Sequence, residues 1–366
     1  MRIGKLELGK LIKNPGIWFL FVSFLILNVL FISGELGGKE GKKEIREMYQ
    51  AVRNGEGELR EEYEEYKDSV DGLYDHLEMM EILKKKEEMA GYHPTGKYQN
   101  FIENNYKKLQ ERVEEIKEKG EDTGDFYPGR IFKFHSLFYG DVKRTLLLEM
   151  FVLMMLSILY LMDYERIQKT RDIVIPTQTG KGVMKIKAVV GLCYGFFLSM
   201  LLFLGTVLYF LYQVPFRGLW NVPVSSKVMA EPRIQMLYPF ITFFRCTMMQ
   251  YFFLSMLVTF LLVCIVAGLA VGFQLLIQNS YLTFLAEGLL FWGLEIFAWF
   301  HTESFLDVVL SVCNFTTLWI TSGAWFMEND FSLSFAGNEF WCVGCQGALA
   351  VGVVLFGRWR YRRGEV

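Results

Sequence analysis

The chain has 366 residues, of which 52% are hydrophobic and 16% aromatic, and its net charge is only −2. This balance excludes a strongly basic nucleic-acid-binding protein and an acidic disordered chain, and the apolar fraction favours a membrane protein. The charges are unevenly placed: residues 34–144 hold 20 Lys+Arg and 26 Asp+Glu, whereas the other 255 positions hold only 18 and 14. One hydrophilic insert therefore interrupts a hydrophobic protein.

The first apolar segment long enough to approach a membrane span is 17–33. A spanning helix needs about 20 mostly apolar residues, and Asn14-Pro15-Gly16 predicts a break just before this one, which separates it from residues 1–16. Ser33 and Gly34 would also suit the end of a signal peptide, but no A-x-A pattern is present. We therefore predict a retained first span.

Five further spans are predicted along the rest of the chain. The long uncharged stretch that follows Cys246 is punctuated by Gln278-Asn279-Ser280, so it is divided into two spans. The five predicted spans are 145–162, 188–212, 247–273, 281–300 and 340–357. The fold class is therefore all-α: a polytopic membrane protein with six transmembrane helices and an insert between the first two.

Residues 308–327 form a possible seventh span, but they include Asn314, Thr316 and Thr321. Such residues suit a segment buried in protein better than one that faces lipid. With six spans, the short cytoplasmic pieces carry 14 basic residues against four in the short outer loops, 213–246 and 301–339. A seventh span would place the basic tail, 358–366, outside. We therefore predict that 308–327 is re-entrant or interfacial, that both termini are cytoplasmic, and that 34–144 is extracellular.

Two heptad stripes run through the insert. The first runs from Leu59 to Met80, and the second from Ile102 to Ile116, both with apolar residues spaced by fours and threes. The turn at 90–96 between them predicts an antiparallel hairpin, in which a continuous helix over 57–89 would extend nearly 50 Å. A shorter helix over 45–54 precedes the hairpin. The domain is either a docking surface for an exported molecule or partner, or merely a packed helical pair with a solvated charged face.

Glu165, Thr170, Pro176, Thr177 and Lys187 lie between the second and third spans or at the start of the third. With these residues the segment resembles the cytoplasmic loop of ABC-2 type transporter permeases. Those proteins follow the second span with a glutamate and a short amphipathic stretch that ends in proline and a hydroxylated residue, and a basic residue opens the next span. Glu165, Thr170, Pro176, Thr177 and Lys187 occupy these places. Residues 6–15 also resemble the amphipathic elbow helix before the first span, and the chain is similar in particular to peptide and lantibiotic exporter or immunity permeases.

The resemblance implies that residues 163–187 contact a separate ATPase. A short helix there could place its apolar side chains in a groove while basic residues fix its register; an ordinary positively charged loop is the alternative. The implied coupling residues are Glu165, Arg166, Lys169, Thr170, Arg171, Pro176 and Thr177.

No G-x-x-x-x-G-K-[ST] motif occurs, since Gly180-Lys181-Gly182 lacks both the spacing and the hydroxyl residue. The chain is therefore predicted not to be an enzyme and to bind no cofactor itself, with ATP and Mg²⁺ bound by two partner ATPase subunits. The resemblance further implies a second permease copy or a homologous permease, contact with membrane lipid, and an exported substrate. No nucleic-acid partner is expected.

Acidic residues within the predicted spans are candidates for the translocation path. Glu287 and Glu295 are eight residues apart on one helix, and Glu149 lies in the second span, where an interfacial position beside Arg144 is the alternative. These three glutamates are the predicted path residues.

Two smaller motifs are open to more than one interpretation. Cys342 and Cys345 have redox or zinc spacing, but a single pair lacks ligands for a metal, so a disulfide and inert packing both remain possible. His301, Glu303 and Asp307 could bind a cation or could belong to a solvated loop. No metal site is predicted.

The sequence thus favours the permease subunit of an ATP-driven exporter in the bacterial cytoplasmic membrane, moving a hydrophobic or amphipathic substrate such as a peptide, antimicrobial or lipid-like molecule. A non-transporting membrane sensor or scaffold, whose extracellular helices bind a ligand, is the alternative. A cytoplasmic signalling domain would favour the latter, but the predicted tail has only nine residues.

Overall fold

The structure is a computed structural model of the whole chain. It describes residues 2–38, 70–121, 131–170, 180–214, 220–226, 231–233, 236–238, 240–298, 302–329 and 331–363, together with scattered helical positions between 43 and 68. Among these residues six helices are long and apolar enough to cross a membrane, which makes the chain a multi-pass membrane protein. This agrees with the six spans predicted from hydropathy.

The first two helices are separated at the predicted break. Helix α1 (Arg2–Ile12) is followed by α2 (Pro15–Glu35), and the side chain of Asn14 caps α2 by accepting hydrogen bonds from the backbone N–H groups of Gly16 and Ile17 at 2.9 and 3.4 Å. Pro15 has no N–H to lose at the first helical position. The amphipathic α1 therefore meets α2 at a capped corner.

The second span is longer than predicted. It consists of α7 (Ile131–Ser136), a π-helical segment η2 (Leu137–Val142) and α8 (Lys143–Met162), which form one apolar helix over Lys133–Met162. The predicted start, residue 145, directly follows the two basic residues Lys143 and Arg144. Lys143 is instead buried, with its ammonium 3.7 Å from the ring centroid of Trp325, so a charge that marked a helix end in the sequence lies inside the helix.

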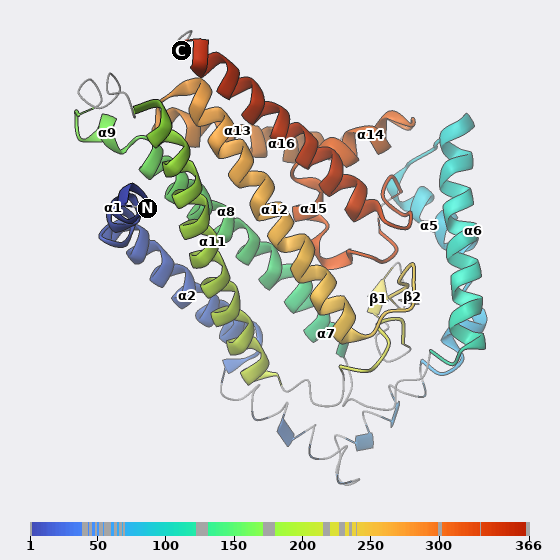
Figure 1. Cartoon of the computed structure of the whole chain (residues 1–366). Coiled ribbons are helices and arrows are strands. Elements are labelled where there is room, and N and C mark those ends of the chain that lie inside the picture. Colours follow the sequence, from blue (N-terminus) through green and yellow to red (C-terminus); the bar gives the residue numbers. More distant parts are fainter. Residues whose placement is uncertain are drawn as a thin grey trace.

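The remaining spans are α11 (Gly180–Gln213), α12 (Met248–Ile277), α13 (Ser280–Ala298) and α16 (Asn338–Arg363). Helix α11 begins eight residues before the predicted span, so part of the expected loop is helical. Helix α8 packs on α11 and α12, and α12 packs on α16. Both chain ends and α9 (Tyr164–Ile167) lie at one end of this bundle, here called the terminal end (Figure 1).

Close helix contacts depend on glycine. A Cβ at Gly195 of α11 would lie 2.7 Å from Met154 Sδ and 3.1 Å from Met154 Cα of α8, and one at Gly272 of α12 would lie 3.0 Å from the Val353 carbonyl carbon of α16. Small residues let membrane helices approach closely, because lipid offers no hydrophobic drive for their association. These glycines therefore permit the two tightest helix pairs of the bundle.

The segment 308–327 is not one helix. It folds as α14 (Leu306–Cys313), α15 (Thr317–Ile320) and a short 3-10 turn η4 (Ser322–Ala324). Asn314 ends α14 and accepts hydrogen bonds from the N–H and hydroxyl of Thr316 at 2.9 and 2.8 Å. Polar side chains thus break the apolar run into short pieces that pack on α8, α13 and α16.

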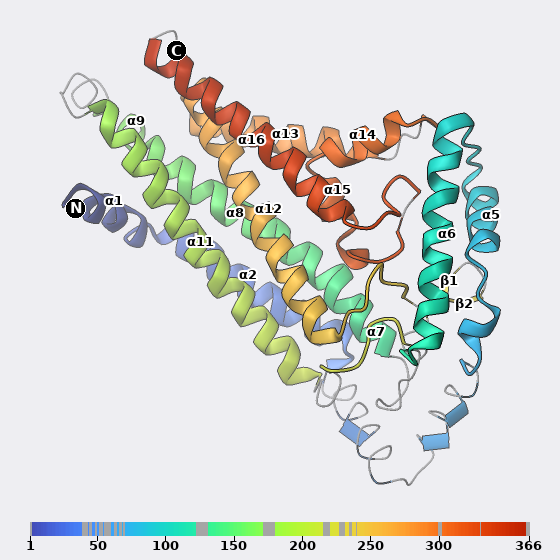
Figure 2. The same ribbon diagram turned by 45° about the vertical axis from the view of Figure 1, so that its right-hand side comes forward.

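The insert forms the predicted antiparallel hairpin, but with a shorter first arm. Helices α5 (Met79–Ala90) and α6 (Gly96–Glu118) pack side by side (Figure 2), and all five predicted stripe residues of α6 are buried. The prediction of one helix over 57–89 was wrong. Gly72, at φ +66°, and a 3-10 turn η1 (Leu73–His76) end any helix before α5, and the expected 45–54 helix lies mostly outside the described residues.

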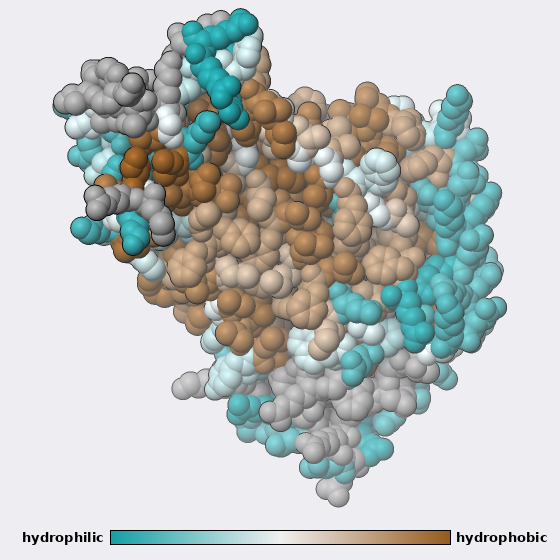
Figure 3. Space-filling model, in the orientation of Figure 1, coloured by the Kyte–Doolittle hydropathy of each residue, from teal (hydrophilic) through white to brown (hydrophobic). Residues whose placement is uncertain are grey.

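The all-α prediction also missed one small feature, since β1 (Glu231–Arg233) and β2 (Met236–Tyr238) pair as an antiparallel ribbon in the loop before α12. The surface follows the sequence partition. Apolar side chains dominate the bundle face and hydrophilic ones cover the α5–α6 hairpin (Figure 3).

Candidate functional site

A cluster of four charged residues joins three elements at the terminal end. Glu165, in the α9 turn that follows α8, pairs with Lys187 of α11 and, at 3.2 Å, with Lys10 of α1. Lys10 also pairs with Glu7 at 2.7 Å. We call Glu7, Lys10, Glu165 and Lys187 the Glu165 cluster. The Lys187 side chain is only 3% exposed, so Glu165 compensates a buried ammonium.

The local fold holds Glu165 in place. The α9 turn ends where Lys169 adopts a left-handed conformation (φ +55°), and the Thr170 N–H donates to the Glu165 carbonyl at 2.8 Å. The Lys10 ammonium also lies 4.4 Å from the ring centroid of Tyr164. Lys10 of α1 is thus attached to two neighbouring residues of this turn, Tyr164 and Glu165.

The neighbours of Glu165 contact a third region, the α12–α13 connection. Arg166 donates to the Gln278 carbonyl at 2.6 Å, and Asp163 accepts from both the N–H and the hydroxyl of Ser280, at 3.1 and 2.9 Å. The four residues 163–166 therefore link the ends of α1, α8, α11, α12 and α13. A force applied to this short segment would reach five of the helices at once.

The structure describes four of the seven predicted coupling residues. Glu165 and Arg166 lie in this junction, and the exposed Lys169 and half-buried Thr170 end the α9 turn. Arg171, Pro176 and Thr177 lie outside the described residues. Sequence reasoning found Glu165 and Lys187 but missed Lys10 as a partner, because nothing in a basic amphipathic helix indicates which lysine meets a distant acid.

Of the three predicted path glutamates, Glu149 is part of an interhelical hydrogen-bond network. Asn28 of α2 donates to Glu149 of α8 at 2.7 Å and to Thr206 of α11 at 3.0 Å. Asn28 and Glu149 are 2% and 5% exposed, so Glu149 is buried among the helices, while Arg144 donates to the Ile320 carbonyl. Asn28 was missed, although a lone amide within an apolar span is a recognisable signal.

Glu287 and Glu295 occupy different surroundings on α13. Glu287 is completely buried, whereas Glu295 is half-buried near the opposite end of the helix. The structure records no contact that joins either to Glu149. The three glutamates therefore do not form one site within the described part of the chain.

The insert is attached to the bundle through polar and aromatic contacts with residues 302–335. Lys86 of α5 pairs with Glu328, which also accepts from the Tyr106 hydroxyl at 2.7 Å. The Tyr92 hydroxyl donates to Asp307 at 2.7 Å, while its ring stacks on Phe331 with centroids 4.8 Å apart. Burial, together with Tyr98 and Asp307, raises the pKa of Tyr92, so this hydroxyl remains a donor.

These contacts also bear on the possible cation site. The carboxylate of Asp307 accepts from Tyr92, from the N–H and hydroxyl of Thr302, and from the N–H of Glu303. The described residues contain no group of His, Cys, Asp or Glu side chains that could hold a metal ion, and His301 lies outside them. Asp307 and Glu303 instead attach the tip of the hairpin.

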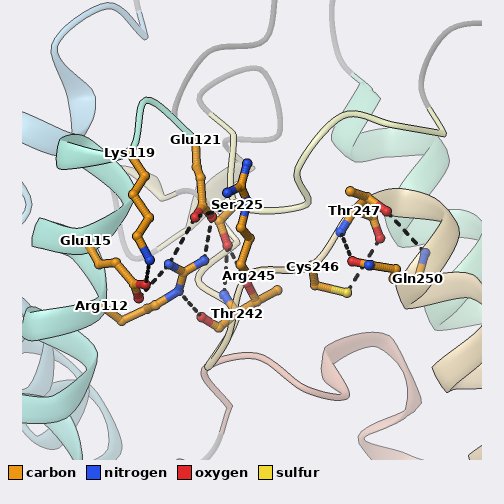
Figure 4. Close-up of polar contacts among 10 residues, drawn as sticks. All are labelled: Arg112, Glu115, Lys119, Glu121, Ser225, Thr242, Arg245, Cys246, Thr247 and Gln250. Carbon is orange, nitrogen blue, oxygen red and sulfur yellow. Dashed lines mark hydrogen bonds and ion pairs between the residues drawn. The ribbon is translucent and has the colours of Figure 1, made fainter.

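A second contact joins α6 to the loop before α12 (Figure 4). The Arg112 guanidinium donates to both carboxylate oxygens of Glu121, at 2.6 and 3.4 Å, and to the Thr242 carbonyl at 3.3 Å. Arg245 approaches the same carboxylate at 3.6 Å, while Glu115 lies on the exposed side of Arg112. Sequence reasoning missed this pair, because Arg112 resembles a solvated residue of the heptad pattern.

The cysteines are all free thiols. Cys342 and Cys345 lie within α16. The thiol of Cys345 forms a side-chain hydrogen bond with that of Cys313 at the end of α14. Gln346 confirms this proximity, because its amide donates to the Val312 and Asn314 carbonyls at 3.3 and 2.7 Å. Outside the spans, burial raises the pKa of the Cys246 thiol to about 12, so that residue packs as a neutral side chain.

Comparison with known proteins provides no further assignment. No family model, curated protein or solved structure matches the chain. The class defined by the fold is a multi-pass membrane protein with a helical insert.

Proposed function

We propose that the chain is the permease subunit of an ATP-binding-cassette exporter in the bacterial cytoplasmic membrane. Two copies, or one copy and a homologous permease, would work with two separate ATPase subunits to move a hydrophobic or amphipathic substrate outward. Both termini and residues 163–187 would be cytoplasmic, and 34–144 extracellular.

The observation that carries this proposal is the connection of residues 163–166 to five helix ends. Arg166 and Ile167 are exposed beside Glu165, so a partner bound there would contact the segment that holds α1, α11 and the α12–α13 connection. An apolar side chain flanked by basic ones suits a groove on a soluble protein. Movement of that partner would be transmitted to the bundle through ion pairs and hydrogen bonds.

The proposed substrate path is based on acidic residues within the membrane-length helices. Glu149, Glu287 and Glu295 all lie on membrane-length helices, where ionisable residues usually mark pathways. The exposed apolar residues of α2, α13 and α16 provide surface for lipid, a second permease or a greasy substrate.

The test is purification of the tagged full-length protein from its native membrane in mild detergent, with identification of stoichiometric partners and an ATPase assay. We expect an ATPase with a phosphate-binding loop to co-purify. Ile167→Asp should abolish this association by placing a charge on the exposed contact residue. Glu165→Gln should retain the ATPase but weaken its stimulation, because it disrupts transmission behind the contact.

The matched control exchanges an exposed pair of the insert, Lys43→Glu with Glu47→Lys, and should leave association unchanged. Recovery of intact protein without any ATPase would overturn the proposal. That outcome would favour the sensor or scaffold function, which the firmly attached outer hairpin would also suit.

A further inference from the structure

Helix α13 has an inverted distribution of polarity. Eight of its side chains are apolar and exposed, among them Tyr281, Leu285 and Trp292 at 78%, 55% and 63%. Within its described residues the two fully buried side chains are polar, namely Thr283 and Glu287, both 0% exposed. Exposed apolar side chains suit a helix that faces lipid, so the feature to be explained is the hydroxyl and the carboxyl that α13 buries.

The buried carboxyl group is unpartnered. Both oxygens of Glu287 lack a hydrogen-bond partner among the residues that the structure describes, as do the Thr283 hydroxyl and the side-chain oxygen of Gln274 on α12. Gln274 follows Gly272 by two residues, and because Gly272 meets Val353 of α16, Gln274 lies on the other side of α12, toward α8 and α13. Helices α12 and α13 thus each bury side-chain oxygens that have no partner among the described residues.

The elements packed against α13 place no compensating charge beside Glu287. On α8, Lys143 lies over Trp325, Arg144 donates to the Ile320 carbonyl, and Glu149 binds Asn28. Glu149 points away from α13, since Phe151, two residues further on, stacks on Phe291 of α13.

The other titratable groups on these elements also lie elsewhere. Tyr160 of α8 neighbours Tyr164. On α12, Tyr251 packs on Tyr139 near the insert end and Cys264 is exposed, while α15 carries no titratable side chain. An ionised carboxylate without water, a donor or a cation is far more costly than its neutral acid, so Glu287 is protonated in this arrangement.

A polar line leads from Glu287 to the terminal end. Ser280, Thr283 and Glu287 recur at i, i+3 and i+7 on one face of α13, and the Ser280 hydroxyl donates to Asp163. Glu287 lies about 10 Å along the helix from Ser280. Toward the C-terminal end of α13, the ring of Phe291, one turn after Glu287, stacks on the ring of Phe151 with centroids 6.1 Å apart.

We propose that Glu287 is an intramembrane proton-binding group that exchanges its proton with water at the terminal end, past Thr283 and Ser280. The acid releases a proton to that water and becomes a carboxylate, and the reverse step reforms the acid. The packed α8–α12–α13 arrangement accommodates only the neutral form, so release requires α13 to separate from its neighbours. This role does not depend on the proposed ATPase coupling.

The first test is infrared spectroscopy of the full-length protein in lipid nanodiscs at neutral pH. Glu287→Gln preserves the shape of the neutral acid and should fold normally, but it should remove one C=O stretching band of a protonated carboxylic acid. Glu295→Gln, on the same helix but half-buried, should retain that band. Identical spectra for wild type and Glu287→Gln, with unchanged thermal unfolding, would show an ionised Glu287 and overturn the proposal.

The second test addresses the route. Transfer to D₂O shifts the same band as the proton exchanges, and its rate can be followed directly. Thr283→Val removes the hydroxyl at nearly constant volume and should slow this exchange several-fold, whereas the control Thr321→Val, at a half-buried residue between α15 and η4, should not. An unchanged rate in Thr283→Val would reject the route past α13. Loss of ATPase association in the earlier experiment would leave both results unaffected, so the two proposals can fail separately.

Discussion

Both the terminal end and the insert end, where α6 meets residues 240–247, contain buried ion pairs, but the two ends use different chemistry. At the terminal end, Glu165 is shared by two lysines, whose side chains are flexible and carry compact charges. At the insert end, the planar Arg112 binds both oxygens of Glu121, with side chains 4% and 1% exposed. Shared lysines can exchange partners during a movement, whereas a buried bidentate arginine fixes one geometry. We infer that the first end transmits motion and the second holds the insert still.

The largest expected effect is at the rigid end. Arg112→Met should leave the buried Glu121 carboxylate with only the distant Arg245 guanidinium and should destabilise the α6 contact by about 3–5 kcal/mol. Amide hydrogen exchange of α6 and residues 240–247 measures this loss. Lys119→Met, in which the replaced side chain is 50% exposed, is the control and should change protection by less than about 0.5 kcal/mol. A loss in Arg112→Met as small as the control's would show that the pair does not hold the insert.

A second effect, of intermediate size, tests whether the terminal cluster acts as a unit. Glu165→Gln and Lys187→Met should each destabilise the bundle, and the double variant should lose less than their sum, with a coupling energy of about 1–3 kcal/mol. Denaturant unfolding in mixed micelles provides the four free energies. Arg166→Gln combined with Lys187→Met is the matched control and should be additive, because Arg166 bonds Gln278 instead. Additivity in the first cycle would contradict a shared Glu165.

A smaller effect is expected where an aromatic residue carries the contact. Tyr92→Phe keeps the stacking on Phe331 but removes the hydroxyl bonded to Asp307, which retains donors from Thr302 and Glu303. The expected cost is about 0.5–1.5 kcal/mol, the usual net value of a hydrogen bond. It is measured by exchange of the amides after residue 302, and Tyr92→Ala should cost more because it also removes the ring.

Much of the fold could be predicted because hydropathy depends on short windows. Six spans and the α6 stripe follow directly from apolar periodicity. The misplaced start of the second span shows the limit of this approach: a window treats Lys143 as exposed charge, whereas Trp325, 182 positions later, covers it. The broken first arm of the hairpin has a similar cause, because the heptad spacing continues across Gly72 although its backbone is left-handed there.

The candidate site was only partly predictable for a different reason. Glu165 was found through local resemblance, which needs no distant contact. Its partner Lys10 and the pairs of Arg112 and Asn28 depend on segments 155, 9 and 121 positions away, respectively. Even the nearest of these, Glu121, lies beyond the end of α6, where helical spacing no longer predicts which way a side chain points. Partners of buried polar groups are therefore fixed by tertiary packing.

The smallest expected effect separates the exposed side of Arg112 from its buried side. Hydrogen bonds from Lys119 and then Arg112 lower the pKa of Glu115 below its ordinary value near 4.5. Because the folded pKa is the lower one, the stabilisation is present above the unfolded value and is lost as pH falls through the folded value. Glu115→Gln should thus reduce α6 protection at pH 7 by less than about 1 kcal/mol, as for other exposed pairs.

This small difference should shrink as the pH falls through the folded pKa of Glu115 and should vanish once Glu115 is protonated in both states, and it should also shrink with added salt. The Arg112–Glu121 contribution should survive the same salt, since both side chains are almost fully buried. Hydrogen exchange of α6 in wild type and Glu115→Gln, between pH 3 and 7, measures the first term. A difference that does not decrease at all as the pH falls would mean that Glu115 stabilises α6 by packing and not by charge, and the insert end would then depend on Glu121 alone for its electrostatic attachment to Arg112.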